Sequence, residues 1–295
     1  MLHSILQSIA NGVLIGSVYG LISVGLTLIF GVMNIVNFAQ GEFLMIGMMA
    51  TVFLTTALGL DPLVIAPLVG VGGFLFGMLS ERIVIEPIIK APQSAQIMAT
   101  VGLSLILANG MSVIAGTNFL SVSTPYQDVT FNVLGLSFSA SFVYAAIYAL
   151  VMAVLLSLFL TKTRYGKAMR ATSQNREAVQ LMGINPRMMY MLAFGLGSAL
   201  TVIAGAVILP YTLTYPYIGQ RYILIMFTVV VLGGLGSVRG AIIAGLIVGI
   251  VQSVSTLVLP IDIQNLPVFV VFFFALVLIP GGVFKRIRKG IKSYA

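Results

Sequence analysis

Long apolar stretches alternate with short polar connections along the whole chain. Most of these stretches reach the roughly twenty residues that an α-helix needs to cross a bilayer. Helices satisfy their backbone hydrogen bonds internally and are therefore the expected spanning elements. The predicted spans lie near 8–31, 41–58, 63–80, 95–115, 141–160, 189–210, 222–235, 240–259 and 266–284. The pattern predicts an all-α, polytopic integral membrane protein with eight or nine transmembrane helices, some short or broken. The count depends on whether 31–43 is a re-entrant bend.

The most polar segment, 161–187, lies between two predicted spans and is rich in Lys and Arg, which marks it as cytoplasmic. Small or apolar residues recur in it at i, i+3, i+4 and i+7, with polar side chains between them. The first face consists of Ala168, Ala171, Asn175, Ala178, Val179 and Met182, and the second of Lys167, Arg170, Gln174, Glu177 and Gln180. We predict a two-faced cytoplasmic helix that docks a partner. Gly183 is expected to end it, and Asn185–Pro186 to begin the next helix. The alternative is a solvated linker that only sets topology.

The remaining basic residues give the predicted orientation. Arg82 and Lys90 follow the third span, and a basic tail, 285–292, follows the last. The connection 117–139 contains no Lys or Arg, as expected of an external loop. Placing every basic connection in the cytoplasm requires an even number of spans between them, which the assignment satisfies. The N-terminus is then expected outside and the C-terminus in the cytoplasm.

Composition supports the membrane class and excludes several others. Apolar residues make up 59% of the chain and charged residues 7%, against about 25% charged in a soluble domain. The net charge of +8 comes from residues at span ends, which positive-inside orientation explains better than nucleic-acid binding. The absence of cysteine excludes disulfides, thiolate metal sites and cysteine nucleophiles. No Lys or Arg precedes Arg82, so a secretory signal peptide is not expected.

The sequence lacks the motifs of an enzyme or a self-energised transporter. It has no phosphate-binding G-x-x-x-x-G-K-[ST] loop. Its one histidine, His3, leaves no histidine-based triad, zinc site or proton relay. A channel filter is not evident. These absences favour a translocation pathway whose energy arrives from a partner at 161–187, with no catalysis and no cofactor of its own.

Two glycine patterns indicate close packing or a break. Small residues recur every four positions at Gly12, Gly16 and Gly20, and again at Ala241, Gly245 and Gly249. This spacing lets helix backbones approach closely in lipid, with no function attached. The glycine-rich block 232–240 is either a broken helix beside a water-filled path or a tight cytoplasmic turn with Arg239 at the interface.

Polar residues inside the apolar regions are the candidate pathway. Asn37 and Gln40 are expected to share one helical face, close to Glu42. An ionisable residue in a span is a functional-site candidate. The alternative is an interfacial turn with Glu42 in headgroup water. Gln96 and Thr100 begin a polar stripe, continued by Ser104, that faces either a pathway or neighbouring helices through hydrogen bonds.

Three blocks resemble the branched-chain amino-acid permeases of bacterial ABC importers, the LivH type. They are GLTLIFG with NFAQGEF at 25–43, GKAMRA with NREA and GIN at 166–185, and VLGGLGS with Gly240 at 231–240. The second block is similar to the coupling-helix region of that family. One departure is Gln40, where relatives often have histidine, which puts any protonation role at that position in doubt.

The resemblance implies a single permease domain, 1–295, with a cytoplasmic coupling loop, 162–187, in a bacterial inner membrane. It implies a homologous second permease, two cytoplasmic ATPase subunits and an external substrate-binding protein as partners. The implied ATPase-coupling residues are Gly166, Arg170, Ala171, Asn175, Glu177, Ala178 and Gly183. Arg170 and Glu177 would make polar contacts in the ATPase groove, and Ala171 and Ala178 would pack against its walls.

The resemblance implies a class of substrates and not a single one. Relatives carry leucine, isoleucine and valine, and also other amino acids, amides, urea or aromatic acids; branched-chain amino acids are the leading expectation. Two rival hypotheses stay open. One is a secondary transporter that uses Glu42 and follows an ion gradient, and the other is a membrane scaffold without transport.

Overall fold

The computed structural model describes residues 2–133, 135–260, 263 and 266–278. Among these residues, seven helices are long and apolar enough to cross a membrane: His3–Met33, Gln40–Leu58, Pro62–Ile88, Gln93–Ala115, Ala140–Lys162, Pro186–Tyr211 and Val238–Ser255. Two shorter apolar helices are Ile218–Gly233 and Leu266–Ala275. These regions coincide with the predicted spans, so the polytopic helical fold is confirmed. The end of the last predicted span and the basic tail lie outside the described residues.

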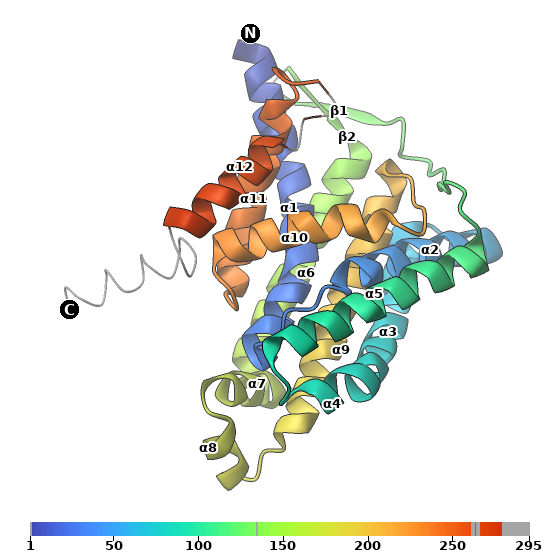
Figure 1. Ribbon diagram of the computed structural model, residues 1–295. Coiled ribbons are helices and arrows are strands. Elements are labelled where there is room, and N and C mark those ends of the chain that lie inside the picture. The colour runs from blue at the N-terminus through green and yellow to red at the C-terminus, as the bar shows by residue number, and fades with distance from the viewer. Residues whose placement is uncertain (1, 134, 261–262, 264–265, 279–295) are drawn as a thin grey trace.

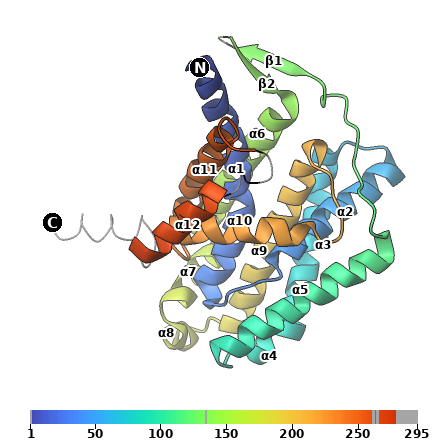
Figure 2. The same ribbon diagram turned by 45° about the horizontal axis from the view of Figure 1, so that its top comes forward.

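Several helices follow the long axis of the molecule and one crosses them. In chain order the elements are α1 (Leu2–Met33), α2 (Gln40–Leu58), α3 (Pro62–Ser80), the π-helical η1 (Glu81–Ile85), α4 (Glu86–Ile88), α5 (Gln93–Ala115), β1 (Thr130–Val133), β2 (Leu136–Ser139), α6 (Ala140–Lys162), α7 (Arg164–Gln174), α8 (Arg176–Leu181), α9 (Pro186–Ile208), the 3₁₀ turn η2 (Leu209–Tyr211), α10 (Ile218–Gly233), α11 (Val238–Ser255) and α12 (Leu266–Leu278). In Figures 1 and 2, α1, α6, α9 and α11 run lengthwise and α10 lies across them. The N-terminus and the strands lie at one end, and α7 and α8 at the other (Figure 1).

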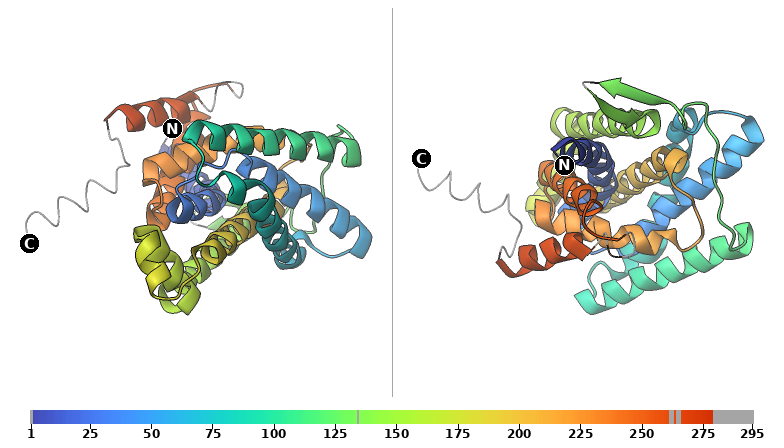
Figure 3. Two further views of the ribbon diagram at one scale, coloured as in Figure 1. Left: turned by 60° about the horizontal axis from the view of Figure 1, so that its bottom comes forward. Right: turned by 90° about the horizontal axis from the view of Figure 1, so that it is seen from above.

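The predicted external loop contains the departure from an all-α fold. Strands β1 and β2 form an antiparallel hairpin, visible at the rim of the molecule in Figure 3. Gly135, in the turn, has φ +82°, a conformation that favours glycine. The hairpin is bound to the start of α1, because the Ser137 N–H donates to Gln7 Oε1 at 2.9 Å. The N-terminus and this loop therefore occupy the same end of the protein.

A second contact at this end joins the loop to the start of α3. The Asp61 carboxylate caps α3 by accepting from the Leu63 N–H at 2.8 Å, as expected of aspartate before a proline at the first helical position. The Tyr126 hydroxyl donates to the same carboxylate at 3.0 Å. Burial, together with the neighbouring Asp61 charge, raises the pKa of Tyr126 well above its usual range. Tyr126 therefore stays protonated and keeps donating at any physiological pH.

The two predicted stripes of small residues pack against each other. A side-chain carbon placed on Gly16 of α1 would lie 2.7 Å from the carbonyl oxygen of Gly245 in α11, and one on Gly245 would meet the backbone of Gly20. Gly12 meets the backbone of α11 in the same way. The expected close approach is confirmed, since only glycine leaves room for these backbones.

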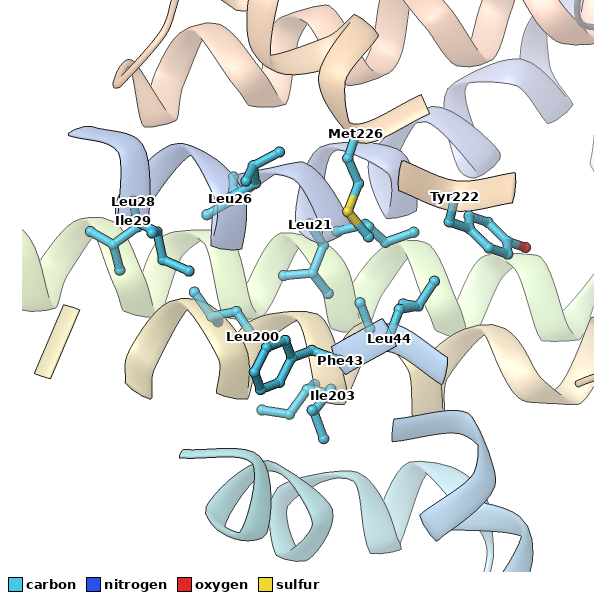
Figure 4. Close-up of a cluster of buried hydrophobic side chains, with 14 of the residues drawn as sticks. Leu21, Leu26, Leu28, Ile29, Phe43, Leu44, Leu200, Ile203, Tyr222 and Met226 are labelled. Atoms are coloured by element: carbon cyan, nitrogen blue, oxygen red, sulfur yellow. The ribbon is translucent and has the colours of Figure 1, made fainter. Parts of the chain in front are cut away.

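Helix α9 lies at the centre of the bundle and packs against α1, α2 and α3. Figure 4 shows Phe43 of α2 beside Leu200 and Ile203 of α9, and Met226 of α10 pointing toward Leu21 of α1. All five side chains are buried. Because apolar side chains gain little by leaving lipid, close packing and hydrogen bonds must hold these helices together.

Candidate functional site

The two-faced cytoplasmic helix predicted within 161–187 is two helices, α7 and α8, so the single-helix prediction is wrong. The break is at Asn175, whose backbone is extended with φ −152° and ψ 106°. Its Oδ1 accepts from the N–H groups of Glu177 at 3.0 Å and Ala178 at 2.9 Å. Asparagine is a favoured N-cap because its side chain replaces a missing backbone acceptor. Asn175 therefore begins α8 and is not part of a continuous helical face.

The start of α7 is fixed by capping and by a glycine. Thr163 Oγ1 accepts from the Gly166 N–H at 3.0 Å. A side-chain carbon on Gly166 would meet the backbone of Phe159 and Leu160 at the end of α6. Gly166 is buried and lets α7 fold back against α6. Gly166 thus packs against another helix of the same chain.

The packed face of α7 differs from the predicted one. Met169 and Thr172 are buried, whereas Ala171 is half-buried and Arg170 is exposed. The predicted face 168–182 does not persist, because the break at Asn175 changes the rotation of the chain. Residues on the two sides of the break therefore no longer form one stripe.

Helix α8 presents most of its side chains to the outside. Val179 is buried, whereas Glu177 and Ala178 are exposed. Leu181 is 90% exposed and Met182 is 77% exposed at the end of the helix. Two large apolar side chains thus lie uncovered beside the charged residues of α7 and α8.

The predicted end of this segment is confirmed. Gly183 has φ +79°, and the Ile184 N–H donates to the Val179 carbonyl at 3.0 Å, the hydrogen bond of a helix-ending glycine motif. Asn185 Oδ1 then accepts from the Arg187 N–H at 3.0 Å and caps α9. The two helices α8 and α9 are therefore joined by a short, fully capped connection.

Two of the predicted pathway residues form a buried hydrogen-bonded cluster. Asn37 Nδ2 donates to Gln40 Oε1 at 2.9 Å. Gln40 Nε2 donates to the Gly197 carbonyl at 3.2 Å and to Thr201 Oγ1 at 2.5 Å, both in α9. Asn37, Gln40 and Thr201 are completely buried. Asn37 precedes α2, so the expectation that it shares a helical face with Gln40 is wrong, although the two side chains bond.

The connection 34–39 enters the protein before α2 begins. Asn34 is exposed at the end of α1, with φ +58°. Ile35, Asn37 and Ala39 are then buried, and Figure 1 shows the chain returning from the end of α1 toward the centre. Both ends of the region 31–43 are helical, because α1 ends at Met33 and α2 begins at Gln40. Any re-entrant bend in this region is therefore limited to the short non-helical connection between the two helices.

Glu42 of α2 is enclosed between α5 and α10. It is 1% exposed, and Ser104 of α5 donates to its Oε1 at 3.1 Å. Its Oε2 has no hydrogen-bond partner among the described residues. A side-chain carbon on Gly219 of α10 would lie 2.5 Å from this oxygen. The alternative in which Glu42 lies in headgroup water at an interfacial turn is therefore wrong.

The predicted polar stripe of α5 separates into two roles. Thr100 Oγ1 lies 3.3 Å from the Val36 carbonyl, next to the buried cluster. Gln96 Nε2 instead donates to carbonyls of the turn before α5, including that of Ala91 at 3.1 Å. Interhelical and local hydrogen bonds explain the stripe, and Gln96 is not brought together with the other candidates.

The glycine-rich block forms a tight turn between α10 and α11, so the broken-helix alternative is wrong. Gly234 and Gly236 have φ +89° and +83°. Gly236 packs against Gly31 at the end of α1. Cavities of about 690 and 580 Å³ flank this contact, and Ser173 of α7 lines both. Helix α7 thus lies directly beneath the place where α1 meets the turn.

A charged contact that sequence reasoning missed joins α8 to α9. The Arg176 guanidinium lies 5.5 Å from the centre of the Tyr190 ring. Nearby, Arg187 pairs with Glu86 of α4 at 3.4 Å. These residues line a cavity of about 200 Å³ together with the buried Glu81. The only sequence signal for this contact was the basic character of the loop.

The described residues include no group of three or more His, Cys, Asp or Glu side chains that could hold a metal ion.

Long apolar helices around a buried polar cluster, with a polar helical unit at one end, define a multi-pass membrane protein. Residues 8–280 match the family described as "Branched-chain amino acid transport system / permease component", and the chain belongs to this family. It is therefore a membrane-spanning permease subunit of the ABC-importer type, a transport subunit and not an enzyme.

Curated relatives match over nearly their whole length. The chain is 32% identical to the high-affinity branched-chain amino acid transport system permease protein LivH of Escherichia coli strain K12, over 95% of this chain and 96% of the relative. Identity to LivH of Salmonella typhimurium is 30% over the same shares. Identity to BraD of Pseudomonas aeruginosa, also named a high-affinity branched-chain amino acid permease, is 26% over 97% of each chain.

Proposed function

We propose that this subunit forms, with a homologous second permease, the pathway of an ATP-driven importer for branched-chain or related amino acids. An external binding protein would deliver the substrate, and two cytoplasmic ATPases would supply the energy. The family match and the names of the relatives support the substrate class. ATP hydrolysis would belong to the partners, because the chain has no phosphate-binding loop.

The observation that carries the proposal is the uncovered apolar end of α8. Leu181 and Met182 are 90% and 77% exposed in a segment whose charges place it in water. Contiguous exposed apolar side chains that are surrounded by polar ones mark an interaction surface. A short helix with an apolar tip fits the helix-in-groove mode of recognition. We propose that the groove that receives α8 belongs to the ATPase. Arg170 and Glu177 would make polar contacts with it, and Ala178 would pack against its wall.

The orientation of the subunit in the membrane follows from the distribution of its basic residues. The end with α7 and α8 carries the basic residues of 161–187 and would face the cytoplasm. The opposite end, with the N-terminus and the hairpin, would face outside, where the binding protein docks. Between them, Asn37, Gln40 and Glu42 would lie beside the path of a zwitterionic amino acid, which amide groups can bind without a formal charge.

Co-purification of the intact chain with its ATPase subunits tests this function. Leu181→Glu should remove the ATPase from the detergent-solubilised complex, because a carboxylate in an apolar groove loses its hydration without a partner. Leu213→Glu is the matched control, since Leu213 is 54% exposed and lies in the connection between α9 and α10, at the other end of α9. Retention of the ATPase by the Leu181 variant would contradict the assigned docking site.

Substrate uptake, measured with the same two variants, distinguishes the rival functions. A secondary transporter would take up substrate along an ion gradient with no ATPase present. A membrane scaffold would lose assembly in the Leu181 variant without any change in substrate flux. ATP-dependent uptake that disappears together with the ATPase supports the importer alone.

A further inference from the structure

The break at Asn175 leaves α8 with few attachments to the membrane body. Its backbone is interrupted from α7, and it contacts α7 and α9. Among the described residues, the one charged or ring contact between α8 and the rest of the protein joins Arg176 to Tyr190. Besides the chain connections at its two ends, α8 can therefore pass movement to α9 through this one side-chain contact.

The Tyr190 end of the contact is firmly held. Tyr190 is 6% exposed and belongs to the main hydrophobic core, whereas Arg176 is half-buried at the first position of α8. Removal of water strengthens a cation–π contact. By comparison, the Arg187 side chain in the nearby ion pair is 75% exposed, and pairs of that kind contribute little. The cation–π contact is the stronger connection of the two.

Helix α9 extends from this contact to the buried polar cluster. Tyr190 and Thr201 lie in one uninterrupted helix, separated by about 16 Å at 1.5 Å per residue. Thr201 and the Gly197 carbonyl both bond Gln40 at the start of α2, two residues before Glu42. A rigid helix with a defined contact at each end is a physical means of coupling two sites.

We propose that Arg176 and Tyr190 are positioning residues that transmit movement of α8 through α9 to the start of α2. The proposal rests on the proposed function, because an ATPase must move α8. Tilting of α9 would then shift its Gly197–Thr201 region relative to Gln40, and with it the environment of Glu42 and Ser104. The contact acts through α9 and does not itself touch substrate.

Labelling of a single cysteine tests the proposal, because the chain has no native cysteine. In a Ser104→Cys background, the assembled complex is treated with N-ethylmaleimide with and without ATP, and the labelling rate is measured. We expect ATP to change this rate. Arg176→Gln and Tyr190→Leu should each reduce the ATP effect by about tenfold, the scale of a partly desolvated cation–π contact. Tyr190→Phe, which keeps the ring, should retain it.

Controls separate this proposal from the docking site and from folding. Arg164→Gln is the matched arginine control, since Arg164 is exposed on α7. The Arg176 and Tyr190 variants should keep the ATPase bound. Their double variant should reduce the ATP effect on labelling no more than either single variant does.

An unchanged ATP effect in Arg176→Gln, or no ATP effect in the parent, would overturn the proposal. Loss of the ATPase from Arg176→Gln but not from Tyr190→Leu would do so too, because it places Arg176 in the docking surface. Absence of the ATPase from the unsubstituted chain contradicts the proposed function instead.

Discussion

The buried polar segment, residues 36–42, and the α7–α8 unit are both polar insertions in an apolar chain, but they satisfy their polar groups differently. In the buried segment, Asn37 and Gln40 bond each other and α9. In the α7–α8 unit, hydrogen bonds stay local and form caps, as at Asn175. The buried segment therefore needs the surrounding helices to satisfy its polar groups. The α7–α8 unit satisfies its polar groups locally, so it can form on the surface of the bundle and exchange binding partners there.

The comparison leads to different expectations for substitution. In a membrane interior, an unsatisfied polar group has no water to replace its partner. In the α7–α8 unit, water replaces a lost hydrogen bond at small cost. Substitutions in the buried segment should therefore act on the stability of the subunit, and substitutions in the α7–α8 unit on its association with the ATPase.

The largest effect is expected at Gly41. A side-chain carbon there would collide with the backbone of Gly219 in α10, so Gly41→Val should prevent folding, because two backbones cannot yield to a side chain. Size-exclusion chromatography of the purified subunit should show aggregation. Gly102→Val is the matched control, since nothing lies within 4 Å of a side-chain carbon at Gly102. A monodisperse Gly41 variant would show that the α2–α10 contact is looser than described.

A smaller loss of stability is expected at Thr201. Its hydroxyl accepts from Gln40 Nε2, so Thr201→Val should cost about 1–2 kcal/mol of unfolding free energy by leaving a buried donor short of a partner. Thermal unfolding of the detergent-solubilised subunit measures this change. The control is Thr56→Val, because Thr56 bonds only the Val52 carbonyl one turn earlier in its own helix among the described residues. Equal effects at the two threonines would show that the bond to Gln40 contributes nothing.

Much of the fold could be predicted from hydropathy because spans must be long, apolar and internally bonded. The break at Asn175 was missed because the helical period continues across it and asparagine suits a face as well as a cap. Thr201 was missed because a threonine in an apolar span usually bonds its own helix. The depth of Glu42 depends on α5 and α10, which are distant in sequence, so no local pattern could give it.

In the α7–α8 unit, Asn175→Ala removes the N-cap of α8 and should destabilise that helix by about 1 kcal/mol. The melting temperature of the membrane body should stay the same, while the affinity for the ATPase falls several-fold. Asn175→Asp keeps an acceptor at the cap and should restore binding. A lowered melting temperature in the alanine variant would mean that α8 is part of the bundle's stability after all, and the contrast between the two regions would fail.

The smallest effect is expected at Glu42, although its carboxyl group is buried between α5 and α10. Glutamine has nearly the same shape and its carbonyl oxygen still accepts from Ser104, so Glu42→Gln should fold normally and keep ATP-driven uptake close to that of the parent. Uptake of radiolabelled leucine into energised vesicles, with and without a protonophore, measures this. Because the energy comes from the ATPase, uptake by both proteins should persist when the proton gradient is abolished. Loss of uptake in Glu42→Gln alone, with the ATPase still bound, would mean that the Glu42 charge is essential to transport. If uptake by the parent also required the gradient, the secondary-transporter hypothesis would replace the importer.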